Sequence, residues 1–150
     1  AARLAEALAD KLRASIDTEI ECVVAPAMGG LIIGHEVARA LGVPSMFLER
    51  VDGTFTLRRG FELAAQARTV MIEDIVTTGL SSREAIEAIH AHGGQVVGAG
   101  CLIDRSAGTA NIGVNLESLA QVSFETFEAD QVPEDLQDIP AIKPGSRGLK

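Results

Sequence analysis

Short apolar runs alternate along this chain with segments of helical periodicity, and no other feature constrains the fold as strongly. Residues 27–42 and 81–94 place apolar side chains three or four positions apart and end in glycine, which is typical of amphipathic helices. Each lies between two apolar runs that are typical of buried strands. These predicted strands are residues 20–26, 43–50, 67–74 and 95–106. This order predicts an α/β fold, in which helices flank a central, mostly parallel sheet.

The remaining segments complete the expected domain. Leucine or isoleucine recurs every fourth residue from Leu4 to Ile16, which predicts an amphipathic helix. Residues 51–63 alternate apolar and polar side chains around an Asp-Gly pair, which predicts a hairpin or a mobile ribbon. A fifth strand is expected over residues 119–127, and an irregular segment rich in Asp, Glu and Pro follows. No repeat or linker interrupts the chain, so we expect one domain over residues 1–150.

Composition excludes several classes of function. The chain has 150 residues, 47% of them hydrophobic, which suits one globular core. The net charge of -8 and the absence of Trp and Tyr argue against binding to nucleic acid. No apolar run approaches the ~18 residues of a membrane-spanning helix. Two cysteines without metal-ligand spacing predict no protein-built metal site and favour a reduced, cytoplasmic setting.

Polar motifs follow three of the predicted strands. They are APAMGG at residues 25–30, EDIVTTGLSS at residues 73–82 and DRS at residues 104–106. Ligands of open α/β sheets bind outside the carboxyl ends of the strands. Because all three motifs lie at such ends, we expect them to meet at one site.

The chemistry of residues 73–82 indicates a sugar phosphate. The loop after the strand would present backbone amides at a helix start, where the helix dipole also favours a phosphate. Thr77, Thr78 and Ser81 add hydroxyl donors, and Gly79 permits close approach. Two adjacent acids would repel that phosphate, but they can accept hydrogen bonds from ribose hydroxyls. The structural alternative is a strand followed by a helix that Thr or Ser caps, with Glu84 nearby.

Residues 73–82 resemble the phosphoribosyl-diphosphate (PRPP) motif of type I phosphoribosyltransferases, in which two acids precede Thr-Thr-Gly and a small residue. Residues 25–42 resemble the diphosphate loop of the family's orotate branch, and residues 48–63 its mobile catalytic ribbon. Residues 101–106 and 139–147 resemble its orotate-binding strand and its C-terminal tail. The resemblance implies the type I phosphoribosyltransferase fold and transfer of ribose 5-phosphate from PRPP to orotate in pyrimidine biosynthesis. It also implies Mg²⁺ held mainly through PRPP.

The resemblance also implies roles for individual residues. The implied PRPP-binding residues are Glu73, Asp74, Ile75, Val76, Thr77, Thr78, Gly79, Leu80, Ser81, Ala27, Met28 and Gly29. The implied orotate-binding residues are Thr77 and Arg105, and the implied catalytic residues are Arg50, Arg58 and Arg59. Many family members carry Lys where this chain has Met28, so only backbone roles are expected in that loop. No Lys or His lies between residues 43 and 63, where better-known members carry both.

Plainer interpretations stay open for several of these residues. Arg105 could form an ion pair with Asp104 at the strand end, and the glycine pair of APAMGG could serve only tight packing. The ribbon could be a solvated hairpin with exposed charges. The three histidines are expected to be structural or solvent-facing: His35, His90 and His92.

Family members also carry an N-terminal hood over the base, before the helix at which this sequence starts. We therefore expect a domain in which the hood is absent, as a fragment of a longer protein or as a hoodless variant. The resemblance implies a homodimer with shared active sites, and the composition predicts no nucleic-acid or membrane partner. Three alternatives remain: a sister enzyme acting on a purine or uracil base, a non-catalytic PRPP-binding regulator, and a structural α/β module.

Overall fold

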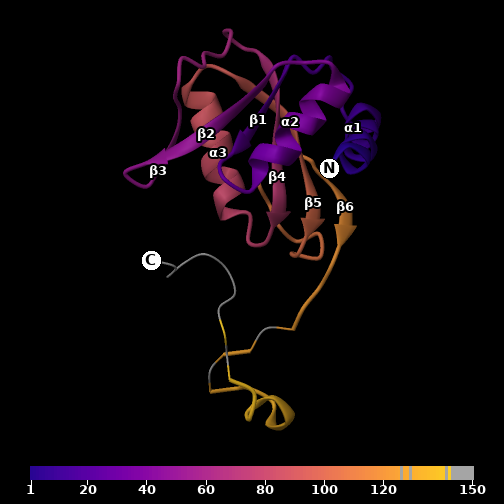
Figure 1. Cartoon of the computed structure of the whole chain (residues 1–150), viewed down its shortest axis with the longest axis vertical. Coiled ribbons are helices and arrows are strands. Elements are labelled where there is room, and N and C mark those ends of the chain that lie inside the picture. The colour runs from indigo at the N-terminus through magenta and orange to yellow at the C-terminus, as the bar shows by residue number, and fades with distance from the viewer. Residues whose placement is uncertain (126, 129, 141, 143–150) are drawn as a thin grey trace.

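The structure is a computed structural model that describes residues 1–125, 127–128, 130–140 and 142. Its helices are α1 (Ala2–Ser15), α2 (Gly30–Leu41) and α3 (Leu80–Ala91), with a 3-10 turn, η1 (Glu134–Leu136). Its strands are β1 (Cys22–Pro26), β2 (Ser45–Val51), β3 (Thr54–Leu57), β4 (Arg68–Val76), β5 (Gln95–Asp104) and β6 (Leu116–Gln121). The alternation predicted from the sequence is thus confirmed (Figure 1).

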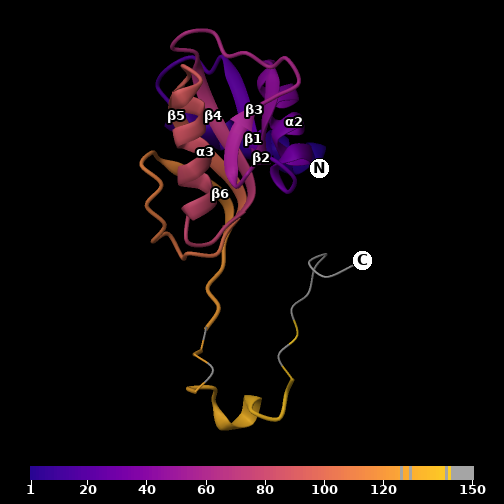
Figure 2. The ribbon, with the colours of Figure 1, turned by 90° about the vertical axis from the view of Figure 1, so that its left-hand side faces the viewer.

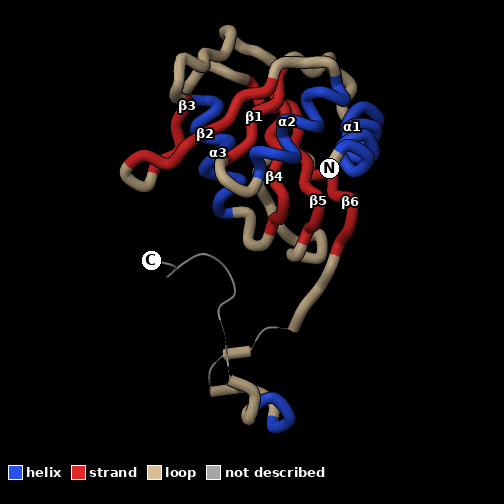
Figure 3. The backbone as a smooth tube through the Cα atoms, in the orientation of Figure 1, coloured by secondary structure: helices blue, strands red, loops and turns tan. Residues whose placement is uncertain are grey.

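The strands form a six-stranded sheet in the order β3-β2-β1-β4-β5-β6 (Figure 3). All neighbours are parallel except β2 and β3, which are antiparallel. From β1 the chain moves outward to β2, then returns to the other side of β1 to form β4. The gap between the ends of β1 and β4 is therefore the topological switch point, where α/β sheets bind ligands.

Helices cover both faces of the sheet, with α1 and α2 on one side and α3 on the other (Figure 2). Leu8 and Leu12 of α1 are fully buried against strand residues such as Val70. Ile89 of α3 is fully buried on the opposite face, where Met71 is part of the same cluster. Burial of each such side chain contributes roughly 1.5–3 kcal/mol, so the sheet is fixed from both sides.

The segment at residues 51–63 contains a hairpin, one of the two forms expected. Val51 of β2 pairs with Thr54 of β3 across a two-residue turn. Both turn residues have positive φ, 50° for Asp52 and 85° for Gly53, as a tight hairpin turn requires. The hairpin therefore extends the sheet beyond β2.

The fifth strand expected at residues 119–127 is wrong in its bounds, since β6 spans Leu116–Gln121. In the described part of the chain β6 pairs only with β5, and that pairing ends with Asp104 beside Gln121. The Val122 amide donates one last bond to the Asp104 carbonyl oxygen, after which the chain leaves the sheet (Figure 1). Of the tail residues that resemble the family, 141 and 143–147 lie outside the described ones. No described helix has the length and apolarity needed to cross a membrane.

Candidate active site

The start of α3 is open towards solvent. Gly79 occupies the N-cap position at φ 74°, and a Cβ there would lie 2.7 Å from Ile112, so glycine is required. No side chain at the N-cap closes the helix, and the Leu80 amide meets the Thr78 hydroxyl at 3.4 Å. Among the described residues, no acceptor is found for the amides of Thr77, Thr78, Gly79 and Ser81. The capped-helix alternative is not observed, and these donors can bind an anion.

The two acids of β4 point to opposite faces of the sheet, as neighbours in a strand do. Glu73 is buried on the α3 side, where the Ser82 hydroxyl donates to its carboxylate at 2.5 Å. Burial raises the pKa of Glu73, and Asp74 adds to that rise. Hydrogen bonds from Ser82 and Ser81 and the charge of Arg50 oppose it. Glu73 therefore joins the start of α3 to β4, besides any role towards a ligand.

Asp74 faces the α2 side and joins the end of β4 to the loop after β1. One of its carboxylate oxygens accepts a bond from the Ile75 amide at 2.8 Å. A Cβ on Gly29 would lie 2.5 Å from the other oxygen, so the carboxylate rests against a glycine backbone. A Cβ on Gly30 would lie 2.9 Å from the Ile72 carbonyl oxygen, so tight packing explains that glycine. Met28 is 79% exposed and brings no charge to the loop.

An apolar pocket lies at the ends of β4, β5 and β6. Its volume is about 430 Å³. Its lining residues are Ile75, Ile103, Arg105, Val122 and Phe124. The Arg105 guanidinium is 5.3 Å from the centre of the Phe124 ring. The structure thus brings the predicted base-binding Arg105 beside the predicted PRPP-binding Ile75.

The expected alternative for Arg105, an ion pair with Asp104, is not present among the described residues. Asp104 instead accepts bonds from the Ser106 amide at 2.7 Å, the Ser106 hydroxyl at 2.6 Å and the Gly108 amide at 2.9 Å. Burial raises the pKa of Asp104, but these hydrogen bonds outweigh it and leave the pKa below its ordinary value. Asp104 therefore shapes the loop after β5 and leaves Arg105 free to face the pocket.

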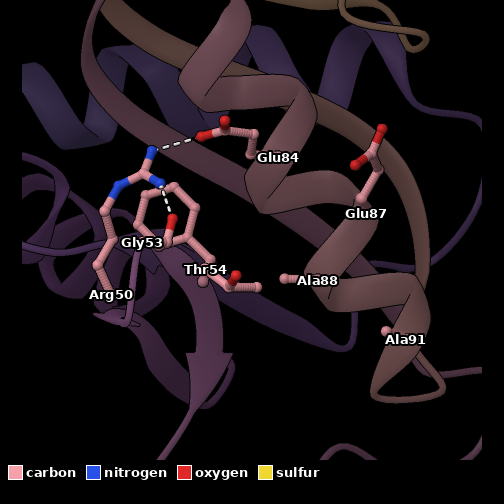
Figure 4. Close-up of a pocket in the computed structure, with 8 residues that line it drawn as sticks. Arg50, Gly53, Thr54, Glu84, Glu87, Ala88 and Ala91 are labelled. Carbon is pink, nitrogen blue, oxygen red and sulfur yellow. Dashed lines mark hydrogen bonds and ion pairs between the residues drawn. The ribbon is translucent and has the colours of Figure 1, made fainter.

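Of the three arginines predicted in the ribbon, Arg50 lies nearest the site. It donates to the Gly53 carbonyl oxygen at 2.6 Å, pairs with Glu84 near the start of α3, and lies over the Phe55 ring (Figure 4). A cavity of about 360 Å³ separates the hairpin from α3 beside this contact. The hairpin thus packs against the same helix whose first turn is open.

Arg58 and Arg59 lie further from the carboxyl ends, because β3 runs back along β2 from the turn. Arg59 makes two hydrogen bonds to Glu49, at 3.0 and 2.9 Å. Arg58 is exposed and has no ion pair within the described part of the chain. The structure does not bring these two arginines to the start of α3. His92 contacts the hairpin instead, accepting a bond from the Leu57 amide at 3.3 Å, which is a structural role.

Sequence reasoning assigned no role to four residues of this region. Ser82 binds Glu73, and Ile103, Val122 and Phe124 line the pocket with Arg105. The role of Ser82 could have been inferred from strand alternation. Neighbouring strand residues point to opposite faces, so one of the two acids had to face the helix that contains Ser82. No local signal marked Phe124, which was assigned to a longer fifth strand.

Comparison with known proteins agrees with this geometry. The family model described as the phosphoribosyl transferase domain matches residues 1–131, and the chain belongs to that family. An orotate phosphoribosyltransferase from Erythrobacter litoralis is 58% identical over 147 residues, covering 98% of this chain and 76% of the relative.

Solved structures show the same fold. An orotate phosphoribosyltransferase from Aeropyrum pernix is 25% identical with a TM-score of 0.58, covering 80% of this chain and 71% of that one. An adenine phosphoribosyltransferase from Thermoanaerobacter pseudethanolicus is 18% identical with a TM-score of 0.65, covering 80% and 79%. The type I phosphoribosyltransferase fold predicted from the sequence is therefore confirmed.

Proposed function

We propose that this chain is an orotate phosphoribosyltransferase, which transfers the 5-phosphoribosyl group of PRPP to orotate and releases diphosphate. One observation carries the proposal: an uncapped helix start, a carboxylate at the switch point and an arginine-lined apolar pocket lie side by side. They match the phosphate, the ribose and the carboxylated base of the two substrates. The 58% identical relative named for this activity supports the same choice.

In the proposed mechanism the protein binds and orients both substrates. The amides and hydroxyls of residues 77–81 hold the 5-phosphate, and Asp74 accepts hydrogen bonds from the ribose hydroxyls. The backbone of residues 27–29 faces the diphosphate. Arg105 grips the orotate carboxylate with its planar guanidinium, which suits a bidentate contact. Alignment of the base nitrogen with the ribose carbon then lowers the barrier without a covalent intermediate on the protein.

Charge on the leaving diphosphate is the second requirement. We assign this role to Arg50, beside the hairpin turn, acting in the site of the partner protomer. Its guanidinium can neutralise charge but cannot act as a general acid near neutral pH. Mg²⁺, when bound with PRPP, would supply further neutralisation. The described residues contain no group of three His, Cys, Asp or Glu that could hold a metal. Proteins usually hold Mg²⁺ through one or two carboxylates, substrate phosphates and water, and Asp74 could supply such a carboxylate.

We further infer a homodimer in which the hairpin completes the partner's site. Mixing Arg50→Ala chains with Asp74→Ala chains should restore activity in the mixed dimer, because one of its two sites would be intact. Mixed dimers that stay inactive would contradict shared sites. The two buried, unpaired cysteines support the inference of a reducing, cytoplasmic location.

The direct test is diphosphate release from PRPP and Mg²⁺ with orotate, adenine, xanthine or uracil as the base. Turnover with orotate, lost in Arg105→Ala, is the expected result. Turnover with a purine or uracil but not orotate would make the chain a sister enzyme. PRPP binding without turnover on any base would indicate a non-catalytic PRPP-binding protein.

A further inference from the structure

Phe124 is an exposed aromatic residue in a chain that has five Phe and neither Trp nor Tyr. Its side chain is 62% exposed, although most large apolar residues of the sheet region are buried. It follows β6 at the point where the chain leaves the sheet, and its ring forms one wall of the pocket around Arg105. The ring is therefore placed to contact any planar ligand that enters this pocket.

The Arg105 side chain has few other constraints. Its neighbour Asp104 is occupied by the bonds from Ser106 and Gly108. In the part of the chain that the structure describes, the Phe124 ring is the partner found for the guanidinium, at 5.3 Å. An arginine over an aromatic face is held by the ring's negative quadrupole while its N–H groups stay free to donate. The contact thus fixes the guanidinium without using its hydrogen-bond donors.

We propose that Phe124 is a positioning residue that holds Arg105 ready for the carboxylate of a planar base, and thereby sets the preference for orotate over uracil. This inference rests on the proposed function. Ile75, Ile103 and Val122 give the base an apolar surface but cannot distinguish a carboxylated pyrimidine from a bare one. That distinction depends on a guanidinium in a defined place. Without the ring, Arg105 samples more rotamers, and the carboxylate must pay the entropy of ordering it.

The test compares Phe124→Leu, which keeps an apolar side chain but removes the aromatic face, with the conservative Phe124→Tyr. Phe127→Leu is the matched control, because Phe127 is 41% exposed on the same segment and does not line the pocket. We expect Phe124→Leu to raise KM for orotate about 5- to 30-fold, with KM for PRPP within about twofold. The orotate-to-uracil preference should fall by a similar factor. Phe124→Tyr should keep the KM for orotate and the orotate-to-uracil preference close to those of the wild type. Phe127→Leu should behave as the wild type.

Orotate kinetics unchanged by Phe124→Leu in an active enzyme would overturn this inference and leave the proposed function standing. Equal rises in KM for orotate and PRPP, or the same change in Phe127→Leu, would also overturn it, since they indicate a general structural effect. A wild-type protein that does not turn over orotate would instead refute the proposed function, and this inference with it. Thermal unfolding of each variant identifies any that fails to fold.

Discussion

Gly29→Ala tests the contact between the loop that follows β1 and Asp74 at the end of β4. The Gly29 backbone has φ -59° and ψ -44°, which alanine adopts without strain, so the substitution adds only a methyl group. That methyl would lie 2.5 Å from one oxygen of Asp74 and 2.7 Å from the other. The carboxylate is the mobile end of its side chain, so we expect it to rotate away and lose its bond from the Ile75 amide.

The size of the effect on catalysis follows from the proposed hydrogen bonds between the ribose hydroxyls and Asp74, which the rotated carboxylate would lose. A hydrogen bond between a ribose hydroxyl and a carboxylate contributes roughly 1.5–3 kcal/mol. Loss of one such bond lowers kcat/KM for PRPP about 10- to 150-fold, since 1.36 kcal/mol is a factor of ten. The free energy of unfolding should change by less than about 1 kcal/mol. Replacing glycine by alanine in an allowed conformation stabilises the chain, and this gain offsets the lost hydrogen bond from the Ile75 amide.

Steady-state kinetics of a double-mutant cycle provide the assay. In an Asp74→Ala background the added methyl meets no carboxylate, so Gly29→Ala should cost almost nothing further. The cycle thus serves as its own control for any other effect of the methyl. Full additivity of the two losses, or a Gly29→Ala enzyme with normal kcat/KM for PRPP, would refute the contact as the cause.

Three further predictions concern stability. The pKa of Glu73 is raised above its ordinary 4.5, so the folded state binds more protons than the unfolded state, and stability falls as pH rises from 4.5 through the folded pKa. Glu73→Gln removes this pH dependence. In urea unfolding, the stability of Glu73→Gln relative to the wild type should therefore increase as the pH rises from 4.5 through the folded pKa of Glu73. A stability difference that does not change with pH would contradict this. Leu8→Ala should cost about 2–5 kcal/mol of unfolding free energy, because Leu8 is fully buried, and a cost below ~1 kcal/mol would mean that α1 packs loosely. Glu84→Gln should cost less than ~1 kcal/mol, since Arg50 and Glu84 are 42% and 39% exposed, and a cost above ~2 kcal/mol would place the pair in a drier setting.

Local patterns in the sequence were enough to predict the helices, most strands and the hairpin. A buried strand, an amphipathic helix and a helix-ending glycine each leave a signal within a few residues. Gly42 ends α2 at φ 77°, as expected for such a stop. The Asp52-Gly53 pair likewise specifies its own turn. The approach of Gly29 and of Arg105 to the end of β4 was predictable too, because topology places the carboxyl ends of parallel strands at one edge.

Contacts between distant segments were beyond local patterns. The approach of Asp74 to Gly29 depends on the order of β1 and β4 in the sheet, and that of Arg50 to Glu84 depends on how the hairpin meets α3. The end of β6 is fixed by the end of its partner β5, so its own residues could not show it. The pocket wall at Phe124 follows from that early end.

The most direct test of the central claim, that the open start of α3 binds the phosphate of a sugar phosphate, is amide chemical-shift mapping. Ribose 5-phosphate would be titrated into ¹⁵N-labelled protein in the presence of Mg²⁺. We predict that the largest saturable shifts fall on the amides of residues 77–82, with smaller ones at Asp74 and Gly29. Shifts concentrated elsewhere, or none at residues 77–82 when the ligand is in excess, would contradict the claim.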